Sequence, residues 1–488
     1  MTDKYTYKDL DIEDVINKYR DCKTTAGDDY FCDRIMNPFS DTEKDFLELV
    51  DYYNIKISND SRFIPSGLNR IGKFKFSDFK THVSEMTSRK SEENGFHYFI
   101  IAAILITFSL IFIYPGFGFL CFLVAVAVAL FSYFSKSKDL AINFFVFKYI
   151  IRLLNGVDPS YLLDEDNVTV NRLVNEMKEI RSVFGSFLHG QFLIKVNEST
   201  EGNPIDVFLD YVRMIFHLDI IKYNRMHKIL CENEDKIIRL YEIIGMFDVA
   251  ILTNKIRINE KCCIVTYTDE NRIYIKGGYH PLINNPVKND VDTNKNILIT
   301  GCNASGKSTF LKMVALNVIW AEAFGYTFAE ECVIRRFDVL SSMAIKDSLK
   351  SGESYFTAEL NSIKRIIATA KTGTPVLCII DEILRGTNTV ERIAASTEIL
   401  KSLKDDNIIC IAATHDIELT KLLDDAYINM HFSEEITQSD VCFSYKIIDG
   451  PSDTRNAIRL LSIMGYDDNI VENAEKRAAS FIENGMWE

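Results

Sequence analysis

The sequence predicts an α/β domain in the C-terminal part of the chain, preceded by an all-α region with an inserted two-helix transmembrane hairpin. Three observations predict this organisation. Apolar residues recur at helical spacing up to about residue 256, strand and helix patterns alternate after it, and residues 98–135 lack charged side chains. The predicted domains are a helical core-like region at 1–95, the hairpin at 96–136, a helical lever region at 137–255 and the α/β domain at 256–488.

Composition fits a folded chain of several domains. The 488 residues are 47% hydrophobic and 25% charged, with only nine prolines, which argues against long disordered segments. The formal net charge of −14 gives no overall attraction to nucleic acid, although a local basic stripe could still bind phosphates. The eleven cysteines form no C-x-x-C pair and residues 1–15 have no signal-like apolar core, so we expect a reducing, cytosolic environment for the polar regions.

The uncharged run at 98–135 is interrupted once, at residues 114–118, where Pro115 and Gly116 indicate a turn. The break leaves two apolar stretches of about 17 residues, near the lower limit for crossing a bilayer. Arg89 and Lys90 precede the run and Lys136 follows it, so the positive-inside rule places both flanks in the cytoplasm. We therefore expect a membrane protein with two spans, anchored through residues 97–135. The alternatives are a buried core hairpin and a helical pair lying in the membrane interface.

A phosphate-binding motif follows the apolar strand predicted at 296–300 and precedes an apolar helix predicted at 309–320. The pattern is G-x-x-x-x-G-K-[ST], in which backbone N–H groups and the helix N-terminus bind phosphates. Lys307 is expected to reach the β and γ phosphates of ATP, and the Ser308 hydroxyl is expected to hold Mg²⁺. The residues predicted to bind the nucleotide are Gly301, Cys302, Asn303, Ala304, Ser305, Gly306, Lys307, Ser308 and Thr309.

Two further strand ends carry polar side chains. The apolar strand at 376–380 ends in Asp381 and Glu382, for which we predict Mg²⁺ binding and placement of the attacking water, respectively. The strand at 408–413 ends in Thr414 and His415, where the histidine could bond the γ-phosphate and report its presence. Taken alone, His415 fits a structural role as well as a catalytic one.

The amino-acid sequences of these motifs resemble those of the MutS family. The phosphate-binding motif with its Lys-Ser-Thr ending is similar to the MutS-type motif. The acidic strand end with the loop that follows it, and the histidine segment, are similar to the corresponding segments of the family. The five matching segments are 279–282, 301–309, 351–360, 381–389 and 413–419. The resemblance covers residue 256 to the C-terminus, where 449–479 is similar to the family's helix-turn-helix dimerisation element. Upstream, 23–27 with Asn37-Pro38 is similar to the start of the family's helical core, and 241–250 to the end of its lever.

The resemblance implies a dimeric ATPase that uses ATP and Mg²⁺, with Lys307, Glu382, His415 and the partner-reaching Ser354 as catalytic residues. It also implies helical levers moved by the nucleotide cycle. Because the sequence starts directly in the core-like segment, we expect no mismatch-binding domain, while the resemblance leaves DNA binding and a mismatch-repair-related role open. The alternative is a membrane-tethered, ATP-switched clamp for an unknown protein partner. A transporter subunit is disfavoured because two short spans form no pathway and no Leu-Ser-Gly-Gly-Gln segment occurs.

Overall fold

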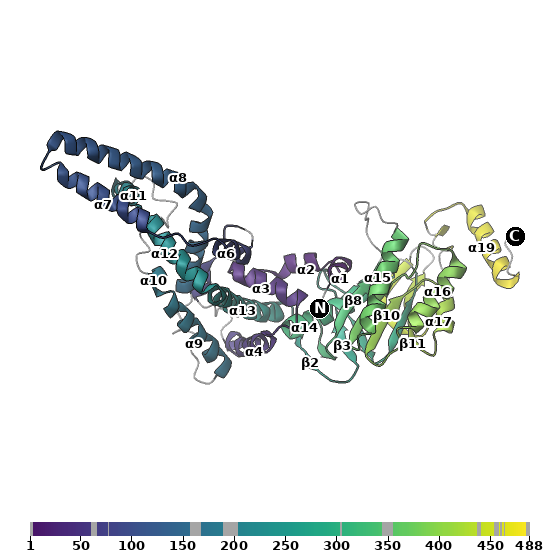
Figure 1. Cartoon of the computed structure of the whole chain (residues 1–488). Coiled ribbons are helices and arrows are strands. Elements are labelled where there is room, and N and C mark those ends of the chain that lie inside the picture. Colours follow the sequence, from purple (N-terminus) through teal and green to yellow (C-terminus); the bar gives the residue numbers. More distant parts are fainter. Residues whose placement is uncertain are drawn as a thin grey trace. The chain divides into compact units, whose positions relative to one another are not determined.

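The computed structural model describes residues 3–59, 66–76, 78–156, 167–188, 204–302, 305–343, 355–436, 441–452, 458, 461–462 and 464–484. The chain forms two compact units. One comprises residues 21–31 and 48–252, and the other comprises residues 1–20, 32–47 and 253–488. The first unit is helical and the second is α/β (Figure 1). The predicted order of a helical region followed by an α/β region is therefore confirmed, whereas the four finer domain boundaries stay a prediction.

The helical unit is built from α5 to α12 and from parts of α3, α4 and α13. The bounds are α3 Thr25–Met36, α4 Glu43–Asn59, α5 Ser66–Ile71, α6 Phe79–Thr87, α7 Gly95–Leu110, α8 Pro115–Gly156, α9 Val168–Val183, α10 Gly185–Leu188, α11 Pro204–Ile215, α12 Leu218–Glu232 and α13 Glu234–Asn259.

A buried carboxylate joins the two upstream segments that carry the family resemblance. Asp248 Oδ2 accepts hydrogen bonds from the backbone N–H and the hydroxyl of Thr24, each at 2.7 Å, and Oδ1 accepts from Lys23 N–H. The Thr24 hydroxyl in turn accepts from Gly27 N–H at 2.9 Å, which satisfies a free donor at the start of α3. Burial raises the pKa of Asp248, and these hydrogen bonds oppose that rise. The sequence segments 23–27 and 241–250 therefore meet in one cluster.

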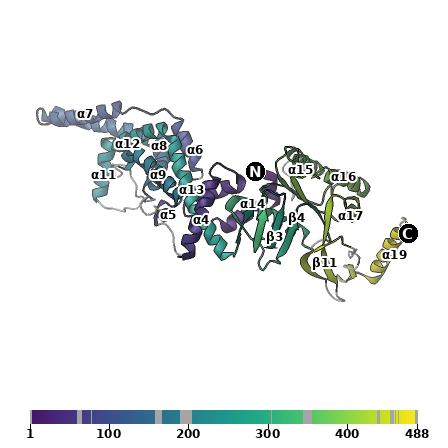
Figure 2. The same cartoon turned by 90° about the horizontal axis from the view of Figure 1, so that it is seen from below.

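The apolar run forms α7 and the first part of α8, which pack against one another (Figures 1 and 2). Their contact is a small core of Ile100, Ile104 and Ala129, while most other apolar side chains of this region are exposed. Within the described residues, one helical stretch is long and apolar enough to cross a membrane, Pro115–Lys136, and 11% of it is buried. Helix α7 has 16 residues and is shorter than a span requires. The predicted pair of spans is thus supported for the second helix only.

The α/β unit contains a six-stranded sheet in the order β12-β11-β5-β10-β9-β8, in which all neighbours are parallel except the edge pair β11 and β12. A four-stranded sheet, β2-β7-β3-β4, and the short pair β1-β6 lie in the same unit. The strands are β1 Cys263–Ile264, β2 Thr266–Tyr267, β3 Ile273–Gly278, β4 Asn289–Thr293, β5 Asn296–Thr300, β6 Tyr326–Thr327, β7 Glu331–Ile334, β8 Asp338–Ser342, β9 Val376–Asp381, β10 Ile408–Ala413, β11 Tyr427–Ile436 and β12 Val441–Asp449. The helices are α1 Lys4–Asp9, α2 Ile12–Tyr19, α14 Lys307–Phe324, α15 Tyr355–Ala370, α16 Thr389–Lys401, α17 Glu418–Leu422 and α19 Asp468–Asn484.

The central strands of the large sheet are buried at every position, as expected for parallel strands covered on both faces. Alternate residues face opposite sides. Leu298, Cys378 and Cys410 belong to a core shared with α15 and α16, and α14 packs against β9 and β10. The core that fixes the strand ends therefore contains β5, β9 and β10 together.

The N-terminal helix α1 packs against β8 in the α/β unit, a contact that the sequence did not reveal. The Thr6 hydroxyl accepts from Ser341 N–H at 3.0 Å, and Asp9 Oδ2 accepts from the Ser341 hydroxyl at 2.7 Å. Because β8 is an edge strand, these contacts cover an otherwise open edge of the sheet.

Candidate nucleotide site

Three strand ends meet where the sequence predicted the nucleotide site. Strand β10 lies between β5 and β9 and runs parallel to both, with Ala413 opposite Ile299 on one side and Asp381 on the other. The phosphate-binding loop, residues 301–306, follows β5, while Glu382 follows β9 and His415 follows β10. Because the carboxyl ends of parallel strands share one edge of a sheet, residues far apart in sequence come together there.

The phosphate-binding loop requires its two glycines. Gly301 has φ of 141° and Gly306 has φ of 107°, a region that side chains disfavour. A Cβ atom on Gly301 would lie 3.1 Å from both the Phe432 carbonyl oxygen and the Ser305 hydroxyl, and one on Gly306 would lie 3.2 Å from the Tyr445 ring. Two predicted members of the loop, Asn303 and Ala304, lie outside the described residues.

Lys307 is the first residue of α14 and is 5% exposed. Its ammonium donates to the carbonyl oxygens of Gly301 and Cys302, each at 2.8 Å. Burial lowers the pKa of Lys307, and the carboxylates of Glu382 and Asp381 oppose that shift. The cation is thus held inside the loop that would surround the phosphates, next to the acids of the neighbouring strand end.

Asp381 ends β9 and is 9% exposed, while Ser308 is the exposed second residue of α14. Burial raises the pKa of Asp381, and a hydrogen bond with the Ser308 side chain opposes the rise. The Oδ1 atom of Asp381 is buried and has no hydrogen-bond partner among the described residues. A hydroxyl beside a carboxylate with a free oxygen is a donor set that suits Mg²⁺.

The described part of the chain has no cluster of three or more histidine, cysteine, aspartate or glutamate side chains that could hold a metal ion. Mg²⁺ in nucleotide enzymes is bound by few protein ligands together with substrate phosphates.

Glu382 has φ of 53° and its carboxylate contacts two side chains. One oxygen is bonded to His415 Nε2 and the other forms an ion pair with Arg385. The hydrogen bond to His415 lowers the pKa of Glu382, with smaller contributions from the charges of His415, Arg385 and Lys307. His415 therefore contacts the acid predicted to place water, an arrangement that the sequence did not specify.

A second ion pair supports the histidine segment. Arg392 of α16 donates to both carboxylate oxygens of Asp416, at 2.8 and 2.6 Å, and Asp416 directly follows His415. Such two-point pairs fix orientation as well as distance. Sequence reasoning missed Arg392 because nothing in its local pattern distinguishes it from a solvated helix residue.

A cavity of about 270 Å³ adjoins the phosphate-binding loop and the start of α14. Its lining is largely apolar and aromatic, as is typical of a site for a flat ring. The lining comprises His280, Ile283, Asn285, Pro286, Val287, Asn289, Gly306, Thr309, Phe310, Met313, Phe432 and Tyr445. The sequence indicated Gly306, Thr309 and the segment 279–282 of this region, but it did not indicate Phe432 and Tyr445, which lie more than a hundred residues along the chain.

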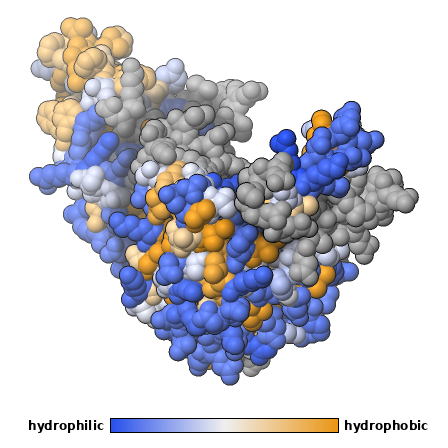
Figure 3. Space-filling model, turned by 90° about the vertical axis from the view of Figure 1, so that its right-hand side faces the viewer, coloured by the Kyte–Doolittle hydropathy of each residue, from blue (hydrophilic) through white to orange (hydrophobic). Residues whose placement is uncertain are grey.

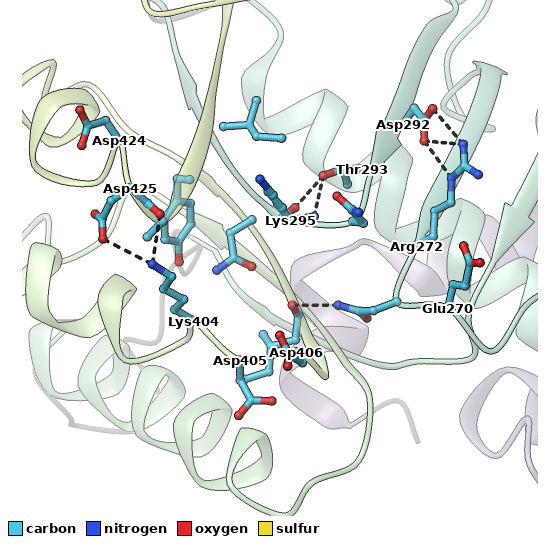
Figure 4. Close-up of a pocket in the computed structure, with 17 residues that line it drawn as sticks. Glu270, Arg272, Asp292, Thr293, Lys295, Lys404, Asp405, Asp406, Asp424 and Asp425 are labelled. Atoms are coloured by element: carbon cyan, nitrogen blue, oxygen red, sulfur yellow. Dashed lines mark hydrogen bonds and ion pairs between the residues drawn. The ribbon is translucent and has the colours of Figure 1, made fainter.

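A larger cavity, of about 1240 Å³, lies where β5, β10 and β11 begin, at the opposite edge of the sheet from the phosphate-binding loop (Figure 4). Asp424, Asp425, Asp405 and Asp406 line it, and two of its cations are already paired with acids: Arg272 with Asp292 at 3.0 Å and Lys404 with Asp425 at 3.4 Å. An acidic cavity of this kind repels a triphosphate. The smaller cavity beside the phosphate-binding loop therefore suits a nucleotide better than this one.

The remaining predicted site residue, Ser354, lies outside the described residues. In the predicted dimerisation element, α19 is present as a helix, and residues 453–457, 459–460 and 463 before it are likewise outside the described residues.

A phosphate-binding loop between a parallel strand and a helix, with acids at the next strand ends, defines a P-loop nucleoside triphosphatase. Comparison with known proteins specifies the class further. Residues 297–482 match the family model "MutS domain V". This part of the chain is thus similar to MutS domain V, which is an ABC-type ATPase domain.

The similar curated proteins are MutS proteins. "DNA mismatch repair protein MutS" of Pseudothermotoga lettingae is 27% identical over 347 residues, covering 68% of this chain and 40% of that protein. The protein of the same name from Thermotoga maritima is 31% identical over 221 residues, covering 42% of this chain and 27% of that protein. The one from Caldicellulosiruptor saccharolyticus is 32% identical over 223 residues, covering 42% of this chain and 26% of that protein. The chain thus spans less than half the length of these relatives.

Proposed function

We propose that this protein is a dimeric, membrane-tethered ATPase whose nucleotide cycle moves its helical region. The observation that carries the enzymatic part is the convergence of Lys307, Asp381 and Glu382 at one edge of the sheet, beside a cavity suited to a nucleobase. The resemblance at 351–360 and the matched MutS domain V support a composite site between two copies. Mixing Lys307→Ala chains with Ser354→Ala chains tests this composite site, because only a mixed dimer would contain an intact one.

The reaction is hydrolysis of the γ-phosphate. The oxygen of a water molecule forms a bond to the γ-phosphorus, the bond to the bridging oxygen breaks, and the electron pair leaves with ADP. Glu382 orients this water and accepts its proton, while Lys307 compensates the negative charge that spreads over the phosphate oxygens. Ser308 and Asp381 would hold Mg²⁺, which when bound supplies further charge neutralisation. His415 and Arg385 hold the Glu382 carboxylate in place before ATP arrives.

The membrane tether rests on the exposed apolar side chains of α7 and α8. Phe99 is 70% exposed, Phe112 77% and Phe131 79%, and no charged residue lies between them. In Figure 3 the orange group at the upper left, fainter because it is more distant, marks this apolar region. Contiguous exposed apolar surface of this extent is typical of a membrane or protein contact, and the length of Pro115–Lys136 favours the membrane.

We expect the wild-type protein to remain with membranes through high salt and carbonate washing, and the double variant Val124→Asp/Val128→Asp to be released. Both valines are more than half exposed on α8, so the charges cost little in the folded protein, but each costs about 3 kcal/mol at the centre of a bilayer. Val168→Asp, at an exposed position of α9, is the matched control and should stay bound. A wild-type chain found in the soluble fraction would refute the tether.

The names of the relatives suggest DNA as a binding partner of this protein. The alternative is a protein partner. The net charge of −14 gives no general attraction to DNA, so binding would need a local basic surface. Capture on duplex DNA across a salt series separates the two: phosphate contacts give an affinity that falls steeply with salt, whereas absence of capture at low salt favours the protein partner.

A further inference from the structure

Helix α15 contacts the loop that follows Glu382, and this contact joins the segments 351–360 and 381–389 through residues to which no role has been assigned above. Glu359, on α15, is 8% exposed, and its Oε1 accepts a hydrogen bond from the backbone N–H of Leu384. A second backbone donor of the same loop, Arg385 N–H, also interacts with this carboxylate. One side chain thus binds the backbone at two successive residues, starting two positions after Glu382.

The loop needs such support because its backbone is strained. Glu382 has φ of 53° and Leu384 has φ of 58°, and both are residues with full side chains in the left-handed region. A residue with a side chain is strained in this region and persists there only where the surroundings hold it. On the β10 side, Glu382 N–H donates to the Ala413 carbonyl at 3.0 Å. On the other side, Glu359 holds Leu384.

The same helix makes a second contact with this loop. Phe356, one turn before Glu359, packs on Gly386, where an added Cβ would lie 3.3 Å from the ring. Between the two contact points lies Arg385, whose guanidinium pairs with the Glu382 carboxylate. The position of α15 therefore determines the course of the loop from Glu382 to Gly386.

The environment of Glu359 argues against a purely stabilising role. Its Oε2 is buried without a hydrogen-bond partner among the described residues, and burial raises the pKa of this carboxyl. A buried carboxylate with one unsatisfied oxygen is costly, and such costs are typically retained at functional positions.

We propose that Glu359 is a positioning residue for hydrolysis: by bonding the backbone of Leu384 it holds the strained loop so that Glu382 faces the attacking water. Glu359 itself touches neither nucleotide nor water. The inference rests on the role proposed for Glu382, and it predicts an effect on turnover that is separate from nucleotide binding.

The test compares Glu359→Ala, Glu359→Gln and Lys364→Ala, an exposed control on the same helix, in the full-length protein. Measured quantities are kcat, the dissociation constant for a fluorescent ATP analogue with Mg²⁺, and the melting temperature. We expect Glu359→Ala to lower kcat on the order of 100-fold with nearly unchanged analogue affinity, because misplacing a catalytic group by about 1 Å has that effect. Glu359→Gln keeps a carbonyl acceptor for Leu384 N–H and should retain most of the wild-type kcat, as should Lys364→Ala.

A wild-type kcat in Glu359→Ala would overturn the inference. A parallel loss of kcat and melting temperature in both the Ala and the Gln variant would also overturn it, because such a loss indicates a structural role only. Loss of affinity as large as the loss of kcat would also overturn it. Glu382→Gln distinguishes this failure from failure of the proposed reaction: if Glu382→Gln is slow while Glu359→Ala is normal, only the positioning role is wrong.

Discussion

Glu382→Gln is expected to bind Mg-ATP and to hydrolyse it about 100-fold more slowly or worse, since positioned acid–base groups contribute 10²–10⁴-fold. The amide preserves the shape of the side chain and leaves Asp381 and Ser308 free to hold Mg²⁺. What it removes is the negative charge of the carboxylate, whose two oxygens contact His415 and Arg385 and which would accept the proton of water. Loss of a negative charge beside the triphosphate should leave nucleotide affinity equal or higher.

Single-turnover hydrolysis and equilibrium binding of Mg-ATP measure the two effects separately. Glu398→Gln makes the same chemical change at an exposed position of α16 and should behave as wild type. Asp381→Asn should have a different effect: it should weaken Mg²⁺ binding, because Asp381 is proposed to hold the ion. If Asp381→Asn and Glu382→Gln both lost Mg-ATP binding, the division of roles between these two acids would be wrong.

Lys307→Ala is expected to abolish measurable turnover and to weaken ATP binding by about 10-fold or more, since a hydrogen bond to a charged group contributes about 1.5–3 kcal/mol. The turnover effect is larger because the lost cation also stabilises charge that develops during phosphoryl transfer. Removing it frees only the carbonyls of Gly301 and Cys302, which lie at the half-exposed loop, so the fold should survive.

Steady-state phosphate release and nucleotide titration measure these losses, with the melting temperature as a check on folding. Lys401→Ala, at an exposed position of α16, removes the same charge away from the site and is the control. Turnover in Lys307→Ala equal to that of the control would remove the phosphate-binding assignment.

The parts of the site that the sequence predicted are those with local signals. The motif at 301–308 predicts a phosphate-binding loop followed by a helix. The apolar composition of the strands that lead to Asp381 and His415 predicts that these strands are buried. Since parallel strands end at one edge, the convergence of Lys307, Asp381 and Glu382 followed from the pattern and is present in the structure.

The parts that could not be predicted depend on contacts between distant residues. Phe432 and Tyr445 reach the phosphate-binding loop because β11 pairs with β5 and β12 with β11, a strand order that no local pattern reveals. Thr6 and Asp9 cover the edge strand β8 although they precede it by more than 300 residues. Glu359 lies in the segment 351–360, but its sequence position did not indicate a role, which follows only from its burial against Leu384.

In the apolar run at 98–135, the lengths of the two helices could not be predicted from the sequence either. Its composition predicted two helices, but the first helix ends at Leu110, before the residues that were needed to reach a span. A turn at 111–114 takes up the residues that join it to α8. Hydropathy therefore identified the apolar region, whereas the length of each helix depended on where the turn forms.

The central claim, an ATPase site completed by a second copy of the chain, is tested most directly by mixing two inactive variants. Lys307→Ala destroys the phosphate-binding loop, and Ser354→Ala removes the serine proposed to act across the dimer. A mixed dimer then contains one intact site, built from the loop of one chain and Ser354 of the other. If pairing is random, about half of the dimers are mixed and hydrolysis should recover to about a quarter of the wild-type rate. No recovery, in a sample shown to contain mixed dimers, would contradict the account.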